Sequence, residues 1–163
     1  MSDSDPDDHR FMQRAIDLAR EVALERSEAG PFGCVIVKDG RIVAEGMNRV
    51  LVDGDPTAHA EMVAIRAACK ALGTHDLTGC TVYTSSEPCP MCYAACWWSR
   101  VDAICCASSI DDAHHHGGFD DRPILDALRL SPEDRPIAFR RRCRDEMLDV
   151  WREFENRTDR PHY

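Results

Sequence analysis

Apolar residues recur at helical spacing near the start of the chain, over residues 9–28, and predict an amphipathic helix there. Gly30-Pro31 is expected to end this helix. Two β-rich runs follow at 34–37 and 41–44. The Asp-Gly pair at 39–40 lies between them, and such a pair is typical of the tight turn of a β-hairpin.

The rest of the chain alternates between helical and strand-like patterns. The expected elements are a helix at 58–72 that stops at Gly73, a strand at 81–84, a helix at 88–98, a strand at 101–107 buried on both faces, a short helix at 124–130, a weaker strand signal at 137–139 and a helix at 144–154. Residues 50–57 and 108–123 are expected to be irregular. This order predicts an α/β layered domain whose strands are parallel in part.

No internal repeat or break in composition divides the 163 residues, so we expect one domain over 9–163. Residues 1–8 are acidic and poor in apolar side chains, which predicts a disordered N-terminal tail. This start also lacks the basic and apolar segments of a signal peptide. No stretch approaches the roughly 20 consecutive apolar residues that a membrane span needs, so no membrane association is expected.

The charge and the cysteines narrow the function classes. Twenty Lys and Arg against 29 Asp and Glu give a formal net charge of −9. This balance argues against a nucleic-acid partner, since binding a phosphate backbone needs a basic face, and it permits a small uncharged substrate. The nine cysteines follow no signal peptide, so we expect reduced thiols and a cytoplasmic protein.

Two short motifs carry the candidate chemistry. His59-Ala60-Glu61 opens one expected helix, and Pro88-Cys89-Pro90-Met91-Cys92 opens the next. Helix starts on one rim of a sheet can bring an imidazole and two thiolates together, a set that suits Zn²⁺ and leaves its fourth position open for water. Glu61 is placed to carry the proton of that water. His-x-Glu with Pro-Cys-x-x-Cys is the signature of zinc nucleobase deaminases.

Other interpretations of these residues stay open. The Cys89-x-x-Cys92 pair also fits a redox site, and a purely structural zinc site would take a fourth protein ligand. The cysteines available for that role are Cys69, Cys80 and Cys96. A zinc-stabilised interaction module without activity would leave Glu61 no role. The histidines at 114–116 and the arginine cluster at 140–144 are expected to be solvated.

Several segments together match motifs of a known family. They are Gly30-Pro31-Phe32-Gly33, Asp55 to Glu61, Tyr83-Thr84-Ser85, Glu87 to Cys92, Gly118-Phe119-Asp120-Asp121 and the C-terminal Tyr163. On these segments the chain resembles the bacterial guanine deaminases of the cytidine deaminase superfamily from about residue 9 onward. The zinc motifs are shared across the superfamily, whereas the last two segments point to the guanine branch.

The resemblance implies a fold, a partner and a site. The fold is a cytidine deaminase-like three-layer α/β/α sandwich with a mixed central sheet, and the partner is a second copy that exchanges its C-terminal segment. One zinc per chain is implied on His59, Cys89 and Cys92, with Glu61 as proton shuttle and Asp121 assisting protonation of the leaving amine. The implied substrate contacts are Phe32, Asn48, Ala60, Trp98, Phe119 and, closing the partner subunit's pocket, Tyr163.

The chain departs from the family pattern at three places that leave the chemistry intact. Ser86 replaces a cysteine that is not a zinc ligand, Trp97-Trp98 replaces another apolar pair, and the segment 114–118 is one residue longer. We predict hydrolytic deamination of a free nucleobase, guanine to xanthine plus ammonia. The alternatives are another amino-azine such as a triazine or modified base, cytosine, guanosine, or adenosine in a tRNA, the last opposed by the acidic charge.

Overall fold

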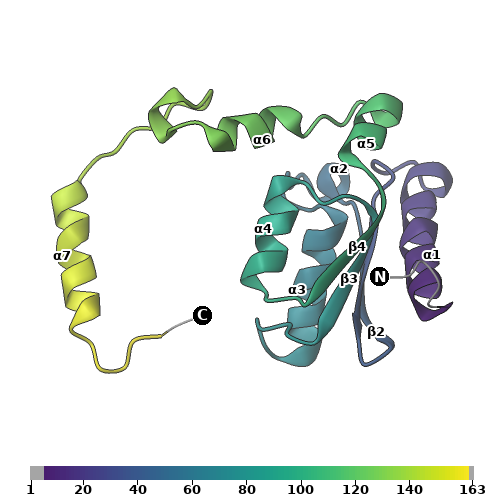
Figure 1. Cartoon of the computed structure of the whole chain (residues 1–163), viewed down its shortest axis with the longest axis horizontal. Helices are drawn as coiled ribbons and strands as arrows, with labels where there is room; N and C mark the ends of the chain where they lie inside the picture. Colours follow the sequence, from purple (N-terminus) through teal and green to yellow (C-terminus); the bar gives the residue numbers. More distant parts are fainter. Residues whose placement is uncertain (1–5, 162–163) are drawn as a thin grey trace. The chain divides into compact units, whose positions relative to one another are not determined.

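The structure is a computed structural model that describes residues 6–161 and divides into two compact units at Arg122 (Figure 1). The first unit opens with α1 (Pro6–Arg20), which continues as one π-helical turn, η1 (Glu21–Glu25). The expected helix is therefore present, but it begins earlier than the apolar pattern indicates. The helix includes residues 6–8, and the rest of the predicted N-terminal tail, residues 1–5, lies outside the described residues.

Four strands form one mixed sheet in the order β2-β1-β3-β4. They are β1 (Gly33–Lys38), β2 (Arg41–Met47), β3 (Cys80–Ser86) and β4 (Ala103–Ser108). Strand β1 pairs antiparallel with β2 and β3, whereas β3 and β4 are parallel. The predicted hairpin is confirmed, and both residues of its turn, Asp39 and Gly40, have positive φ as a two-residue turn requires.

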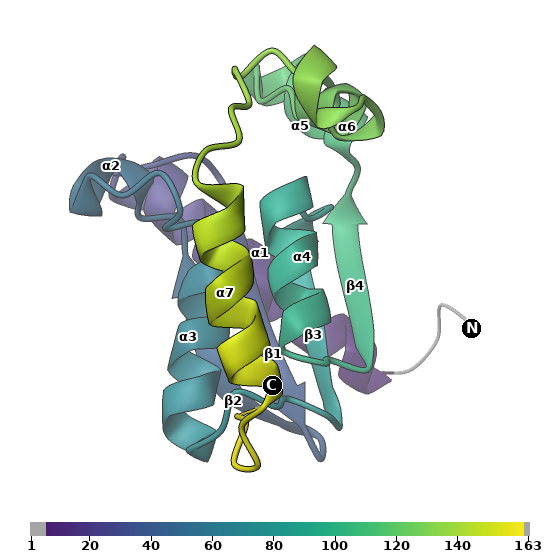
Figure 2. The ribbon, with the colours of Figure 1, turned by 90° about the vertical axis from the view of Figure 1, so that its left-hand side faces the viewer.

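Helices cover both faces of the sheet in the first unit (Figures 1 and 2). Helix α1 lies on one face, while α3 (Ala60–Leu72) and α4 (Pro90–Trp98) lie on the other. Val35 and Tyr83 pack toward α1, whereas Cys34 and Val82 pack toward α3. The alternation of side chains along each strand thus supplies two apolar layers, and the expected three-layer α/β/α arrangement is confirmed.

Three local expectations in the first unit are wrong. Strand β4 is an edge strand with half-buried or exposed side chains rather than one buried on both faces, because apolar composition alone does not tell a central strand from an edge. The stretch 108–123 contains α5 (Ile110–Gly117), whose capping box between Ser109 and Asp112 was a readable helix start. The loop expected at 50–57 contains the one-turn helix α2 (Val50–Asp53).

The second unit, residues 123–163, holds most of α6 (Arg122–Arg129), a 3₁₀ turn η2 (Pro132–Asp134) and α7 (Arg144–Glu155). Residues 137–139 form no strand. None of the residues described in this unit is buried. Its large exposed apolar side chains are Ile124, Leu128, Leu130, Ile137, Phe139, Met147, Val150 and Trp151. Among the described helices of the chain, none is both long and apolar enough to span a membrane.

Gly46 on β2 marks the closest approach of α3 to the sheet. A Cβ on Gly46 would lie 2.2 Å from the carbonyl oxygen of Ala60 and 2.6 Å from the amide nitrogen of Ala64. Both are backbone atoms, so the whole helix would have to shift. We therefore predict that Gly46→Ala lowers the free energy of unfolding by about 1–3 kcal/mol in urea denaturation.

Gly30→Ala is the matched control for this prediction. The atoms nearest to a Cβ on Gly30 belong to two aromatic side chains, Phe119 and Phe32, which can rotate. The control should therefore lose less stability than Gly46→Ala. Equal losses in the two variants would show that α3 is not fixed by its backbone contact with β2.

Candidate active site

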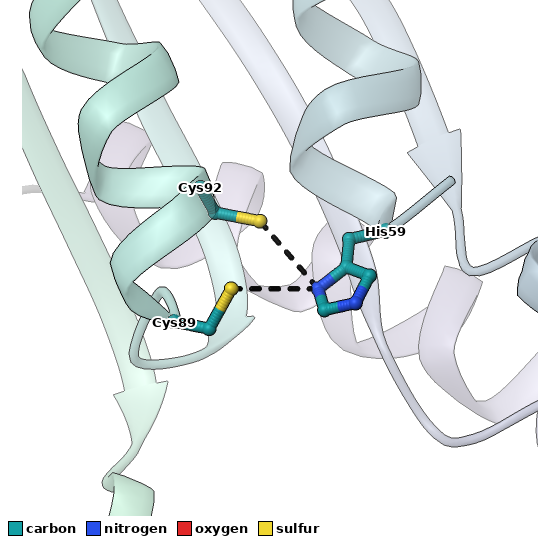
Figure 3. Close-up of side chains that lie close together, drawn as sticks. All are labelled: His59, Cys89 and Cys92. Atoms are coloured by element: carbon teal, nitrogen blue, oxygen red, sulfur yellow. Dashed lines mark hydrogen bonds between the residues drawn. The ribbon is translucent and has the colours of Figure 1, made fainter. Parts of the chain in front are cut away.

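The candidate active site lies where two helices begin. His59 is the N-cap residue of α3 and Cys89 is the N-cap residue of α4, both with extended backbone. Cys92 lies in the first turn of α4, and Figure 3 shows the three side chains pointing toward one another from the two helices. The positive end of the α4 dipole favours the thiolate form of both cysteines.

The spacing of these side chains fits a tetrahedral zinc ion. The Sγ atoms of Cys89 and Cys92 each lie 3.6 Å from Nδ1 of His59 (Figure 3). Zinc–nitrogen bonds of about 2.0–2.1 Å and zinc–sulfur bonds of about 2.3 Å at a tetrahedral angle place the two ligand atoms about 3.6 Å apart. Among the described residues, this is the group of three metal-ligating side chains that converges in this way. Three protein ligands leave one position open.

One thiol of this group has a lowered pKa, which favours the thiolate form that binds a metal. A hydrogen bond from Cys92, together with the nearby His59, lowers the pKa of Cys89 to about 4. The pKa of Cys92 is raised in turn, because its one proton is shared between the Sγ atom of Cys89 and the carboxylate of Glu61. The hydrogen bond with Cys89 also raises the pKa of His59. By contrast, burial raises the pKa of Cys96 to about 12, so this cysteine remains a neutral core thiol.

Glu61 lies in the first turn of α3, directly beside the metal-ligating group, and is only 5% exposed. Thr84 Oγ1 donates to its Oε1 at 3.2 Å, and Cys92 Sγ donates to its Oε2 at 3.5 Å. Burial raises the pKa of Glu61 above its ordinary value, although these two bonds act in the opposite direction. A buried carboxyl with a raised pKa is suited to accept and return a proton near neutral pH.

A cavity of about 270 Å³ opens over this site. Its volume lies just below the roughly 300–1,000 Å³ of typical small-molecule sites, so it suits a small planar ligand. Its apolar wall includes Phe32 and Phe119, whose rings meet edge to face at 4.9 Å. Its polar side chains are Asn48, His59, Glu61, Ser86, Glu87 and Asp121.

Two polar residues predicted from the sequence, Asn48 and Asp121, line the cavity. The Oδ1 atom of Asn48 accepts the N–H of Val50 at 3.0 Å, so its NH₂ group remains to donate. Asp120 is held by Arg122 at 2.7 Å, and this hydrogen bond lowers the pKa of Asp120 to about 2. Asp121 lines the cavity instead, and burial raises its pKa. The pKa values of the two adjacent carboxyls are therefore shifted in opposite directions.

The remaining predicted contacts are placed differently. Ala60 is fully buried, and Trp98, in the last turn of α4, is 63% exposed. Neither lines the cavity within the described part of the chain. Tyr163 lies outside the described residues.

Several residues at the site were not predicted from the sequence, and two of them, Glu87 and Thr84, make polar contacts there. Glu87 lines the cavity, and its Oε2 accepts the N–H of Ile110 at 3.2 Å. Its place directly before the Pro-Cys-x-x-Cys motif was a signal for it. Thr84 holds Glu61. It lies in the matched segment Tyr83-Thr84-Ser85, but a threonine inside a strand is ordinary, so that segment alone assigned it no role at the site.

We predict that Cys89 is the reactive thiol of the metal-free protein. Its folded pKa of about 4 lies below the ordinary cysteine value of about 8.5, so at pH 6 the folded protein carries the thiolate and the unfolded protein the thiol. After chelation, iodoacetamide at pH 6 should alkylate Cys89 faster than the buried Cys34 or Cys96, as read by mass spectrometry of peptides.

Zinc is the test of this assignment. One equivalent of zinc per chain should protect Cys89, and His59→Ala should slow its alkylation in the metal-free protein. Labelling of Cys89 at the same rate with and without zinc would contradict the metal site.

Comparisons with known proteins agree with this geometry. The family model for the cytidine and deoxycytidylate deaminase zinc-binding region matches residues 5–108. The chain is similar to guanine deaminase of Bacillus subtilis (strain 168), with 46% identity over 152 residues that cover 91% of this chain and 96% of the relative. It is also similar to the tRNA-specific adenosine deaminase of Aquifex aeolicus (strain VF5), with 42% identity over 104 residues covering 64% and 67%.

A solved structure matches as well. The X-ray structure of guanine deaminase from Bacillus subtilis has a TM-score of 0.89 to this chain at 44% identity, covering 95% of this chain and 98% of that one. These findings confirm the predicted resemblance, the fold, the zinc cofactor and the aminohydrolase class. The chain belongs to the cytidine and deoxycytidylate deaminase zinc-binding family.

Proposed function

We propose that this zinc-dependent deaminase acts on free guanine and releases xanthine and ammonia. The main support for this proposal is the length of the match to guanine deaminase. The match covers 91% of the chain and so must include more than half of residues 123–163. The match to the tRNA-specific adenosine deaminase covers only 64% of the chain. The net charge of −9 also argues against a tRNA substrate.

The proposed mechanism distributes proton transfers between two carboxyls. His59, Cys89 and Cys92 would hold the zinc, which when bound activates a water as nucleophile at neutral pH. Glu61 accepts a proton in the cavity and returns it to the ring nitrogen beside the amino-bearing carbon. Asp121, with its raised pKa, assists protonation of the leaving amine.

The cavity also offers a means of selecting the base. The NH₂ group of Asn48 is free to donate, because its Oδ1 is occupied by Val50. The ring carbonyl of guanine or cytosine can accept this bond, as can a ring nitrogen of any purine. Phe32 and Phe119 supply an apolar wall against which a planar ring can stack. This chemistry supports a planar base with an acceptor at its ring edge, such as guanine.

A homodimer with exchanged C-terminal segments completes the proposal. No residue described in the second unit is buried, and Ile137, Met147 and Trp151 are exposed there. A segment without a core of its own needs another surface to cover these side chains. In this arrangement Tyr163 closes the partner subunit's pocket. All nine cysteines are free thiols, which fits a reducing compartment and the proposed cytoplasmic location.

We predict that Glu61→Gln keeps one zinc per chain but lowers kcat for guanine by roughly 10²–10⁴-fold, because the amide cannot carry the proton. Ammonia release and metal analysis measure the two quantities. Asp120→Asn is the control, since Asp120 is paired with Arg122 and does not line the cavity, and it should keep its activity. Zinc-loaded wild-type protein that releases no ammonia from guanine, guanosine, isoguanine, cytosine, adenine or aminotriazines would contradict the deaminase proposal.

The exchanged tail has its own test. Deleting residues 158–163 should leave the zinc content unchanged and sharply lower turnover of guanine, because the pocket of the partner subunit would stay open. Mixing this truncated chain with full-length Glu61→Gln should restore part of the activity, since one site of the heterodimer combines an intact Glu61 with an intact tail. Full activity of the truncated chain alone would remove the exchanged tail from the proposal.

A further inference from the structure

Thr84 is a buried hydroxyl in an otherwise apolar row. Cys80, Val82 and Thr84 alternate along β3 on the face that packs against α3 and α4, and the first two belong to the apolar core there. Thr84 is only 1% exposed. A hydroxyl at such a position loses its hydration on folding, so it is tolerated when it has a hydrogen-bond partner. That partner is Glu61, at 3.2 Å.

The strand anchors this hydroxyl more firmly than the helix anchors the carboxylate. Thr84 pairs with Cys34 of β1 on one side and with Cys106 of β4 on the other, so its backbone is held from both directions. Glu61 reaches the site on a side chain with several rotatable bonds. A fixed donor on the sheet therefore restricts which way the carboxylate faces.

The other donor to Glu61 depends on the metal. Cys92 Sγ donates to Oε2 at 3.5 Å, but a cysteine that binds zinc does so as a thiolate and has no proton to give. The buried thiols of Cys34 and Cys96 lie nearby and hold their protons, because burial raises the pKa of each. The hydroxyl of Thr84 keeps its proton whether or not the metal is bound.

We infer that Thr84 is a positioning residue. Its hydroxyl on the sheet holds Oε1 of Glu61 by a hydrogen bond and so keeps Oε2 turned toward the metal-ligating cysteines. This inference rests on the proposed function, because it assigns Glu61 the proton transfer. Thr84 does not line the cavity and so is not itself in reach of the substrate. Its effect is expected on the turnover step rather than on binding of the base.

A pair of substitutions tests the hydroxyl alone. Thr84→Val keeps the shape and removes the donor, and should lower kcat about 10- to 100-fold, the effect of one hydrogen bond to a charged group, with KM changed less than about twofold. Thr84→Ser keeps the donor and should retain kcat within about threefold. Both variants should hold one zinc per chain.

Thr81→Val is the control variant. It removes a hydroxyl from the same strand on the opposite face and should keep the wild-type kcat.

A second measurement is independent of activity. In a double-mutant cycle, Thr84→Val and Glu61→Ala should be non-additive in the unfolding equilibrium constant by at least about fivefold, because each removes the same bond. Additive effects would overturn the contact. A non-additive cycle with unchanged kcat in Thr84→Val would overturn the positioning role while the proposed function stands. If wild-type protein deaminates none of the bases, the proposed function fails and the cycle alone decides whether Thr84 holds Glu61.

Discussion

At Gly46 the backbones of β2 and α3 approach so closely that no side chain fits between them. This contact seats the first turn of α3 on the sheet, and that turn carries Glu61 with His59 as its cap. On the other side of β1, strand β3 leads directly into the start of α4 with Cys89. The distances among the metal-ligating atoms therefore depend on how closely α3 approaches the sheet. A shift of about one ångström at Gly46 would move the imidazole of His59 by a similar distance.

Burial and pairing give three carboxyls near the site different properties. Asp120 is tied to an arginine and stays ionised, with its pKa lowered to about 2. Asp121 faces the cavity, and burial raises its pKa. Glu61 is buried more deeply and is held by a hydroxyl and a thiol. An enzyme that must take up a proton and later release it needs groups whose pKa values have been moved toward neutrality. Burial is the largest cause of that shift in Glu61 and Asp121, and the charge of Cys89 adds to it.

The two units differ in how they are stabilised. The first has apolar layers on both faces of its sheet, centred on residues such as Ile36 and Val35. The second exposes the apolar face of α7, including Val150 and Trp151, and buries none of its described residues. The second unit must therefore be stabilised by packing against a surface outside itself. The proposed exchange between subunits is thus a matter of folding stability and not of the reaction.

The sequence by itself determined the zinc motifs, the hairpin and the helices that carry the site, because these depend on neighbours in the chain. His59 with Glu61, the Cys-x-x-Cys spacing and the helix stop at Gly73 are all local signals. Only the tertiary structure decided that β4 is an edge strand, that the Trp98 side chain is exposed, and that Thr84 holds the buried carboxylate. These properties depend on which distant segments pack together, and neither apolar periodicity nor motif spacing contains that information.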